Sequence, residues 1–81
     1  QLISPAKTPR GLTWDGHYLW VVDDATDKLI QFDANDGTTI KEFSAPSGGS
    51  SGLAYDGKYL WESDHSANAI YMVDPKNGKV L

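Results

Sequence analysis

The sequence predicts an all-β fold made of two similar halves. Three observations lead to this prediction: an internal repeat, short strand-like segments separated by turn residues, and the absence of a window with helical periodicity. In the repeat, residues 11–20 (GLTWDGHYLW) align on residues 52–61 (GLAYDGKYLW) at an offset of 41, and seven of the ten residues are identical. The alignment continues without a gap, placing Asp23 on Asp64, Asp33 on Asp74 and Gly37 on Gly78.

Each repeat divides into four short segments that suit β-strands. In the first repeat, Asp15-Gly16 is a dipeptide that tolerates the positive φ of a tight hairpin, and polar turns follow at residues 23–27 and 33–37. The second repeat has the same order, and its last turn is Asp74–Gly78. Four strands in about 40 residues are typical of one blade of a β-propeller. The predicted strands of the first repeat are Leu12–Trp14, Tyr18–Val22, Leu29–Phe32 and Thr38–Phe43.

The composition of the second segment predicts that both faces of the sheet are covered. In Tyr18–Val22 neither alternate set of residues is polar, which is the condition of a blade placed between two neighbours. We therefore predict one module over residues 1–81. Residues 1–10 form the end of an outer strand and a connecting loop, residues 11–43 the first blade, and residues 52–81 the second blade.

Two blades are too few to close a propeller, so the sequence also predicts assembly. Lys79–Leu81 aligns with the start of the fourth strand of the first repeat, and Gln1–Ile3 aligns with its end. Copies joined head to tail restore the repeat, and such contacts close into rings or propagate. We expect a homo-oligomer, namely a trimer with six blades, with a tetramer of eight blades as the alternative. The other interpretation is that the chain is a fragment of a larger propeller.

Composition excludes several classes of partner. The chain has 81 residues, seven Lys and Arg against eleven Asp and Glu, and a formal net charge of −4. This balance argues against a nucleic-acid or anionic-membrane surface. No apolar run reaches the roughly 20 residues that span a bilayer. The sequence has no cysteine, which excludes a disulfide and a thiolate zinc site. We expect no cofactor.

The repeated strings resemble a group of bacterial and archaeal propellers. GLTWDGHYLW and the segment Asp74–Leu81 (DPKNGKVL) look like blades of the YVTN, NHL and related classes, and the resemblance covers the whole chain. These motifs specify a blade rather than an activity, so the resemblance implies a propeller and leaves the function open. Assembly of six blades from three two-bladed chains is similar in architecture to small bacterial fucose-binding lectins.

A shorter segment resembles a family of enzymes. Leu60–Asp64 (LWESD), followed by residues 70–81, looks like the Tyr-Glu-Ser-Thr segment of propeller-type glutaminyl cyclotransferases. In that family the Glu transfers protons in the active site, and the matching residue is Glu62. The chain departs from the motif, with Trp61 in place of Tyr and Asp64 in place of Thr. That family also uses a single chain of five blades, whereas two-bladed chains assemble into even numbers.

The second blade contains the residues that we single out as candidate site residues. Glu62 replaces Val21 of the first repeat, and a carboxylate at an apolar position must find a partner, reach solvent or have a raised pKa. It is the candidate catalytic residue. Asp23 and Asp64 are expected to cap turns. As an alternative role, His65, next to Asp64, could pair with Glu62 in a metal site, although no motif of fixed spacing supports a metal. The predicted ligand-binding residues are Glu62, Asp64, His65, Asp23 and Asp24.

We therefore interpret the chain as a self-assembling binding or interaction scaffold, with a small molecule or carbohydrate at the ring mouth or central channel. The first alternative is an enzyme of lyase, hydrolase or glutaminyl-cyclotransferase type that uses Glu62. The second alternative is a fragment of a larger propeller without a function of its own.

Overall fold

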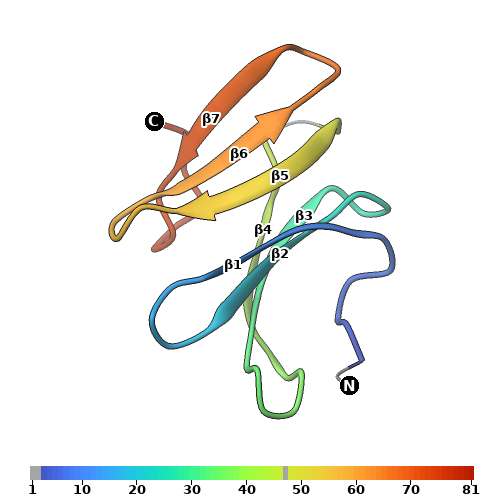
Figure 1. The fold of residues 1–81 in the computed structure, drawn as a ribbon, viewed down its shortest axis with the longest axis vertical. Helices are drawn as coiled ribbons and strands as arrows, with labels where there is room; N and C mark the ends of the chain where they lie inside the picture. Colours follow the sequence, from blue (N-terminus) through green and yellow to red (C-terminus); the bar gives the residue numbers. More distant parts are fainter. Residues whose placement is uncertain (1–2, 47) are drawn as a thin grey trace.

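The computed structural model describes residues 3–46 and 48–81, and it confirms the prediction of an all-β chain. These residues form seven antiparallel strands in two open sheets, and no helix occurs among them. Figure 1 shows the first sheet below the second one. Within this part of the chain, no helix is long and apolar enough to cross a membrane.

The two sheets follow each other along the chain. Sheet 1 has the order β1-β2-β3-β4, and sheet 2 has the order β5-β6-β7. The strands of sheet 1 are β1 (Pro9–Trp14), β2 (Leu19–Asp23), β3 (Lys28–Phe32) and β4 (Thr39–Ser44). The strands of sheet 2 are β5 (Ser50–Tyr55), β6 (Leu60–Asp64) and β7 (Ala69–Val73).

Strand register is the same in the two sheets once 41 is added to each residue number. Trp14 pairs with Leu19 in sheet 1, and Tyr55 pairs with Leu60 in sheet 2. The register shift that interrupts β1 and β2 before Gly11 recurs before Gly52. Both first hairpins turn through a glycine at positive φ, 100° at Gly16 and 103° at Gly57, a conformation that glycine adopts without strain.

The prediction of a fourth strand in the second repeat was wrong for the described residues. β4 pairs with β3 over several residues, whereas its counterpart after β7 is a single bridge between Val73 and Val80. One further hydrogen bond follows, from the Leu81 amide to the Met72 carbonyl. Residues 79–81 follow the Asp74–Gly78 turn, and they pair with β7 only through this bridge and this hydrogen bond.

Alternate residues of each strand point to opposite sides of its sheet, which defines two faces. The side chains directly opposite each other in the register share a face. Face A carries Leu12, Trp14, Leu19, Val21, Ile30 and Phe32 in sheet 1 and Leu53, Tyr55, Leu60, Glu62, Tyr71 and Val73 in sheet 2. Face B carries Trp20, Val22 and Leu29 in sheet 1 and Trp61, Ser63, Ile70 and Met72 in sheet 2.

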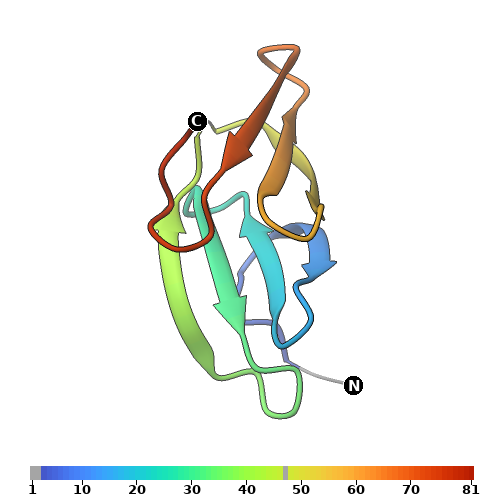
Figure 2. The same cartoon turned by 90° about the vertical axis from the view of Figure 1, so that its left-hand side faces the viewer.

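The main core lies between face B of sheet 1 and face A of sheet 2. Trp20, Val22 and Leu29 from sheet 1 are fully buried there against Leu60 and Val73 of sheet 2. At one side the last turn of the chain lies beside β4 (Figure 2), where Lys41 Nζ donates to the Pro75 carbonyl at 3.2 Å. The sheets therefore pack with unlike faces together, and the fold leaves face A of sheet 1 and face B of sheet 2 on the outside. The segment before β1 covers part of face A of sheet 1, where Ala6 packs with Val21, Ile30 and Phe32 in a second buried cluster.

Candidate functional site

Glu62 lies in the core between the two sheets. β6 alternates its burial, so Leu60, Glu62 and Asp64 lie on face A, whereas Trp61 lies on face B. This phase follows from the register with β5, in which Glu62 lies opposite Leu53. Because face A of sheet 2 packs against sheet 1, the Glu62 side chain is completely buried.

One oxygen of the Glu62 carboxyl has a partner, and the other has none in the described part of the chain. Ser50, at the start of β5, donates its hydroxyl to Glu62 Oε1 at 2.5 Å, and both residues are buried. Glu62 Oε2 is buried without a hydrogen-bond partner. A buried polar atom of this kind costs free energy unless the group changes its protonation state.

The surroundings of Glu62 favour its protonated form. Burial raises the pKa of Glu62, the hydrogen bond from Ser50 opposes this effect, and the nearby charges of Asp64 and Asp27 raise the pKa further. Tyr71 lies opposite Glu62 in β7, and no basic group contributes to the shift. A neutral carboxyl in this place can hold or exchange a proton, but no substrate reaches it while the sheets are packed.

Asp23 and Asp64 cap the turns that follow β2 and β6. Asp23 Oδ1 accepts from the amides of Thr8 and Ala25 at 3.0 and 3.1 Å, and Oδ2 accepts from the Thr26 hydroxyl at 2.7 Å. Burial acts to raise the pKa of Asp23, but these hydrogen bonds outweigh it and hold the pKa below its ordinary value. In sheet 2, Asp64 accepts from the amides of Ser66 and Ala67.

Asp24 and His65 follow these caps and reach the surface. The Asp24 carboxylate lies 3.6 Å from Arg10 Nε, and the His65 side chain is exposed. The two turns lie on the same side of the molecule, to the right in Figure 1, but in different sheets. The structure thus brings Glu62 and Asp64 together on one face, whereas His65 lies outside the core. The prediction that these residues bind a ligand stays a prediction.

Two further aspartates, Asp15 and Asp56, organise the two sheets. Asp15 Oδ1 accepts from the amides of His17 and Tyr18, and Oδ2 accepts from Trp20 Nε1 and Gln31 Nε2, both at 2.8 Å. Burial acts against ionisation, but the four bonds lower the pKa of Asp15.

Asp56 repeats this arrangement in sheet 2. It accepts from the amides of Lys58 and Tyr59 and from Trp61 Nε1 at 2.6 Å. The bond from the Tyr59 amide, then those from Trp61 and Lys58, lower the pKa of Asp56. The signal in the sequence is a Trp five residues after the Asp of the Asp15-Gly16 and Asp56-Gly57 pairs.

The acidic residues do not form a metal centre. Among residues 3–46 and 48–81, no group of three or more His, Cys, Asp or Glu side chains has an arrangement that holds a metal ion. Asp27 acts on Glu62 only through its charge, and its own side chain is exposed. No pattern in the sequence identifies Asp27 as a neighbour of Glu62, because its closeness to β6 depends on how the sheets pack.

No protein-family model matches the sequence, and a search of curated proteins found no match. What the chain does is therefore inferred from the geometry of the two sheets.

Proposed function

We propose that this chain is a self-assembling β-propeller module that serves as a binding or interaction scaffold. In this proposal the two sheets are two blades, and copies of the chain join to close a ring. The observation that carries the proposal is the exposure of the outward faces. Where sheet 1 fully buries Trp20 and Leu29, sheet 2 leaves the equivalent Trp61 37% exposed and Ile70 71% exposed.

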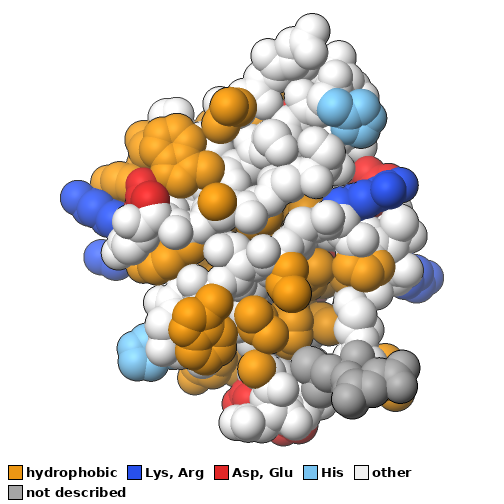
Figure 3. All heavy atoms as spheres, in the orientation of Figure 1, with side chains coloured by type: hydrophobic (Ala, Val, Ile, Leu, Met, Phe, Trp, Pro, Cys, Tyr) orange, Lys and Arg blue, Asp and Glu red, His pale blue; other side chains and the backbone are white. Residues whose placement is uncertain are grey.

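The exposed apolar surface is a reason for association. On sheet 1, Leu12 is 60% exposed and Trp14 53% exposed, and Figure 3 shows apolar side chains open to solvent over both sheets. Large exposed apolar patches mark interaction sites in soluble proteins. Covering them contributes roughly 25 cal/mol per Å², so a neighbouring sheet on each outward face stabilises the assembly.

The size of the assembly is the direct test. We expect a trimer with six blades, and a tetramer is the alternative. Because one chain has a mass of 8.8 kDa, light scattering at micromolar concentration should give about 26 kDa for three copies or about 35 kDa for four. The melting temperature should rise with protein concentration, since folding and association are then coupled. A folded monomer at 8.8 kDa with a constant melting temperature would contradict the proposal and favour a fragment of a larger propeller.

The proposed ligand site is the mouth of the ring. The turns after β2 and β6 lie on one side of the chain (Figure 1), and a ring gathers such turns from successive blades around one opening. They carry Asp24 in sheet 1 and His65 in sheet 2, both beyond the turn-capping Asp23 and Asp64. Carboxylate and imidazole groups accept or donate hydrogen bonds to hydroxyls, so a carbohydrate or another small polyhydroxylated molecule fits this mouth.

A titration with a panel of mono- and disaccharides, followed by calorimetry, tests the ligand site. Asp24→Ala and His65→Ala should abolish binding of any sugar that the wild type binds, and the mass of the assembly should not change. His17→Ala is the control, because His17 is also exposed but lies in the hairpin between β1 and β2, at the other end of the strands. Equal loss of binding in all three variants would contradict a site at this mouth.

The enzyme alternative has less support from the geometry. Its candidate catalytic residue, Glu62, is fully buried between the sheets, and a general acid must reach its substrate directly or through one water molecule. The position of Glu62 therefore favours the scaffold over an enzyme.

A further inference from the structure

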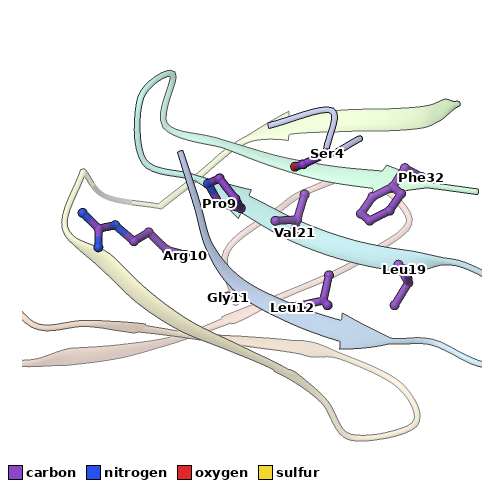
Figure 4. A pocket seen from close by; sticks show the side chains of 8 residues that line it. All are labelled: Ser4, Pro9, Arg10, Gly11, Leu12, Leu19, Val21 and Phe32. Atoms are coloured by element: carbon purple, nitrogen blue, oxygen red, sulfur yellow. The ribbon is translucent and has the colours of Figure 1, made fainter. Parts of the chain in front are cut away.

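The two outward faces of the chain are not alike. Face A of sheet 1 has an open pocket of about 390 Å³, and Figure 4 shows Leu12, Leu19, Val21 and Phe32 pointing into it. Arg10 extends away from these apolar side chains, so the floor of the pocket is apolar. Face B of sheet 2 has a smaller hollow, of about 240 Å³, beside Trp61 and Ile70. Both faces carry large exposed apolar side chains, so the two faces differ in the size of the hollow rather than in exposure.

The packing within the chain supplies a template for how these faces fit. Inside the molecule, face B of sheet 1 covers face A of sheet 2, with Trp20 and Leu29 against Leu60 and Val73. The exposed Trp61 and Ile70 are the equivalents of Trp20 and Leu29. The pocket residues Leu19 and Phe32 are the equivalents of Leu60 and Val73. The two outward faces are therefore the two halves of a contact that the chain already makes once.

The close approach of β1 and β5, the first strands of the two sheets, supports the same pairing of faces. A Cβ atom on Gly11 would lie 2.8 Å from the Leu53 amide nitrogen, so β1 and β5 pass in backbone contact where the sheets meet. Gly52 is the equivalent residue on the outward face of sheet 2. A Cβ there would meet only Ser63 Oγ of its own sheet, at 2.8 Å. The glycine needed for the approach of another strand is therefore present on the open face.

The segment before β1 leaves room for such a neighbour. The Asp24 amide donates to the Thr8 carbonyl at 3.0 Å, and the His65 amide donates to the Gly49 carbonyl at 3.2 Å. Thr8 precedes β1 as Gly49 precedes β5, and Gly49 belongs to the connection that arrives from sheet 1. The segment that leads into β1 therefore follows the same path as the connection that leads from sheet 1 into β5. The pocket on face A of sheet 1 lies beside this path and is open.

We infer that the partner of the pocket on face A of sheet 1 is face B of sheet 2 of a second copy of this chain. This inference rests on the proposed function and adds the surfaces and their orientation: the contact joins unlike faces, with Trp61 and Ile70 of one copy over Leu12, Leu19 and Val21 of the next. Contacts of this kind continue from copy to copy until a ring closes. A contact between like faces would instead end at a dimer.

A pair of blocked variants separates these arrangements. Leu12→Glu places a charge at the pocket, and Ile70→Glu places one on the opposite outward face. Both residues are largely exposed in the single chain and belong to neither buried core cluster, so each variant should fold, as far-UV circular dichroism checks. Each variant alone should be a monomer of 8.8 kDa. Mixed in equal amounts, they should form a 1:1 dimer of about 18 kDa through the one intact contact. Ala34→Glu, in the exposed turn between β3 and β4, should assemble like the wild type.

The outcomes distinguish this inference from the proposed function. If the wild type is a monomer, both fail. A second outcome is that the wild type assembles, each blocked variant still forms dimers with itself, and the mixture contains no 1:1 complex of the two variants. In that case like faces pair, and only this inference is overturned. If both variants assemble fully, the contact uses other surfaces, which also overturns it. A variant that does not fold is replaced by Leu12→Ser or Ile70→Ser, for which the same 1:1 complex is expected.

Discussion

The two sheets of this chain repeat one motif in the same register but differ in what covers them. Trp20 and Trp61 occupy equivalent positions, and the indole N–H of each donates to the aspartate five residues earlier. Trp20 is fully buried, whereas Trp61 is partly exposed. The difference comes from what covers each indole. Sheet 2 lies over Trp20, which also stacks on Phe43 of β4, whereas no second sheet in the described part of the chain lies over Trp61 and sheet 2 has no fourth strand. Comparing the two tryptophans therefore separates what a residue contributes to the stability of its own sheet from what it contributes to the contact between sheets.

A second pair of equivalent positions shows the reverse case, in which two different residues are buried to a similar extent. Val21 and Glu62 are equivalent, and both are buried. Val21 lies at the floor of the outward pocket, whereas Glu62 lies in the core between the sheets. The chain thus keeps a carboxyl in its internal contact and an aliphatic side chain on the outward face, which gives the two contacts of the proposed ring different chemistry.

The largest expected effect comes from removing the two tryptophans separately. Trp20→Ala should destabilise the chain by about 3–5 kcal/mol, the usual cost of emptying a buried aromatic site. Trp61→Ala should cost clearly less in the dissociated chain and should weaken assembly instead. Urea denaturation at low protein concentration measures the first effect, and light scattering measures the second. Equal losses of stability in the two variants would contradict the comparison.

Replacing Glu62 with the residue found at the equivalent position of sheet 1 should stabilise the chain. Glu62→Val copies Val21 and removes a buried carboxyl oxygen that has no partner. A buried polar atom without a hydrogen-bond partner costs about 1–3 kcal/mol, so we expect a gain of this order. Thermal denaturation at neutral pH should show a higher melting temperature. A lower one would mean that the bond with Ser50 makes Glu62 a structural partner, and Ser50→Ala would then cause a similar loss.

Replacing Asp15 should cost more stability than replacing Asp56, just as replacing Trp20 should cost more than replacing Trp61. Asp15→Asn weakens charge-assisted bonds to Trp20 and Gln31 in a half-buried place, and we expect a loss of about 1–3 kcal/mol. Asp56→Asn should have a smaller effect, since Asp56 is exposed. Chemical denaturation of both variants at one pH compares them, and a larger loss for Asp56→Asn would contradict the expectation.

The smallest expected effect is a shallow maximum of stability at mildly acidic pH. Because the pKa of Glu62 is raised above its ordinary 4.5, the stability that its protonation contributes is complete below about pH 4.5 and is lost as the pH rises through the folded-state pKa. The lowered pKa values of Asp15, Asp23 and Asp56 act oppositely. Their contribution is present above the ordinary 3.8 and is lost as the pH falls through their folded-state values.

Melting curves from about pH 3 to pH 8 measure this dependence. The wild type should gain stability on acidification from neutral pH and lose it again below about pH 4. Glu62→Gln keeps the shape of the side chain but cannot titrate, so it should remove the gain and keep the acid loss. An unchanged profile in Glu62→Gln would show that another group causes the gain.

The sequence by itself determined the local structure of this protein. The repeat predicted the first three strands of each sheet at an offset of 41, and their register follows that offset, whereas the predicted fourth strand of the second repeat is a single bridge. The turns were also predictable, because Asp-Gly pairs and the capping Asp23 and Asp64 act on backbone groups only a few residues away. These interactions are short in sequence, so the residue types alone specify them.

The packing of the sheets decided what the sequence could not. Alternation in a strand shows which side chains share a face, but it does not show which face meets another sheet. Only the packing buries Trp20 and exposes Trp61, and only the packing brings Asp27 near Glu62. The carboxyl of Glu62 becomes a buried group of raised pKa because a sheet distant in sequence covers it, and the pocket on sheet 1 stays open because no sheet among the described residues lies over it. Burial depends on neighbours in space, and two similar motifs therefore differ wherever their neighbours differ.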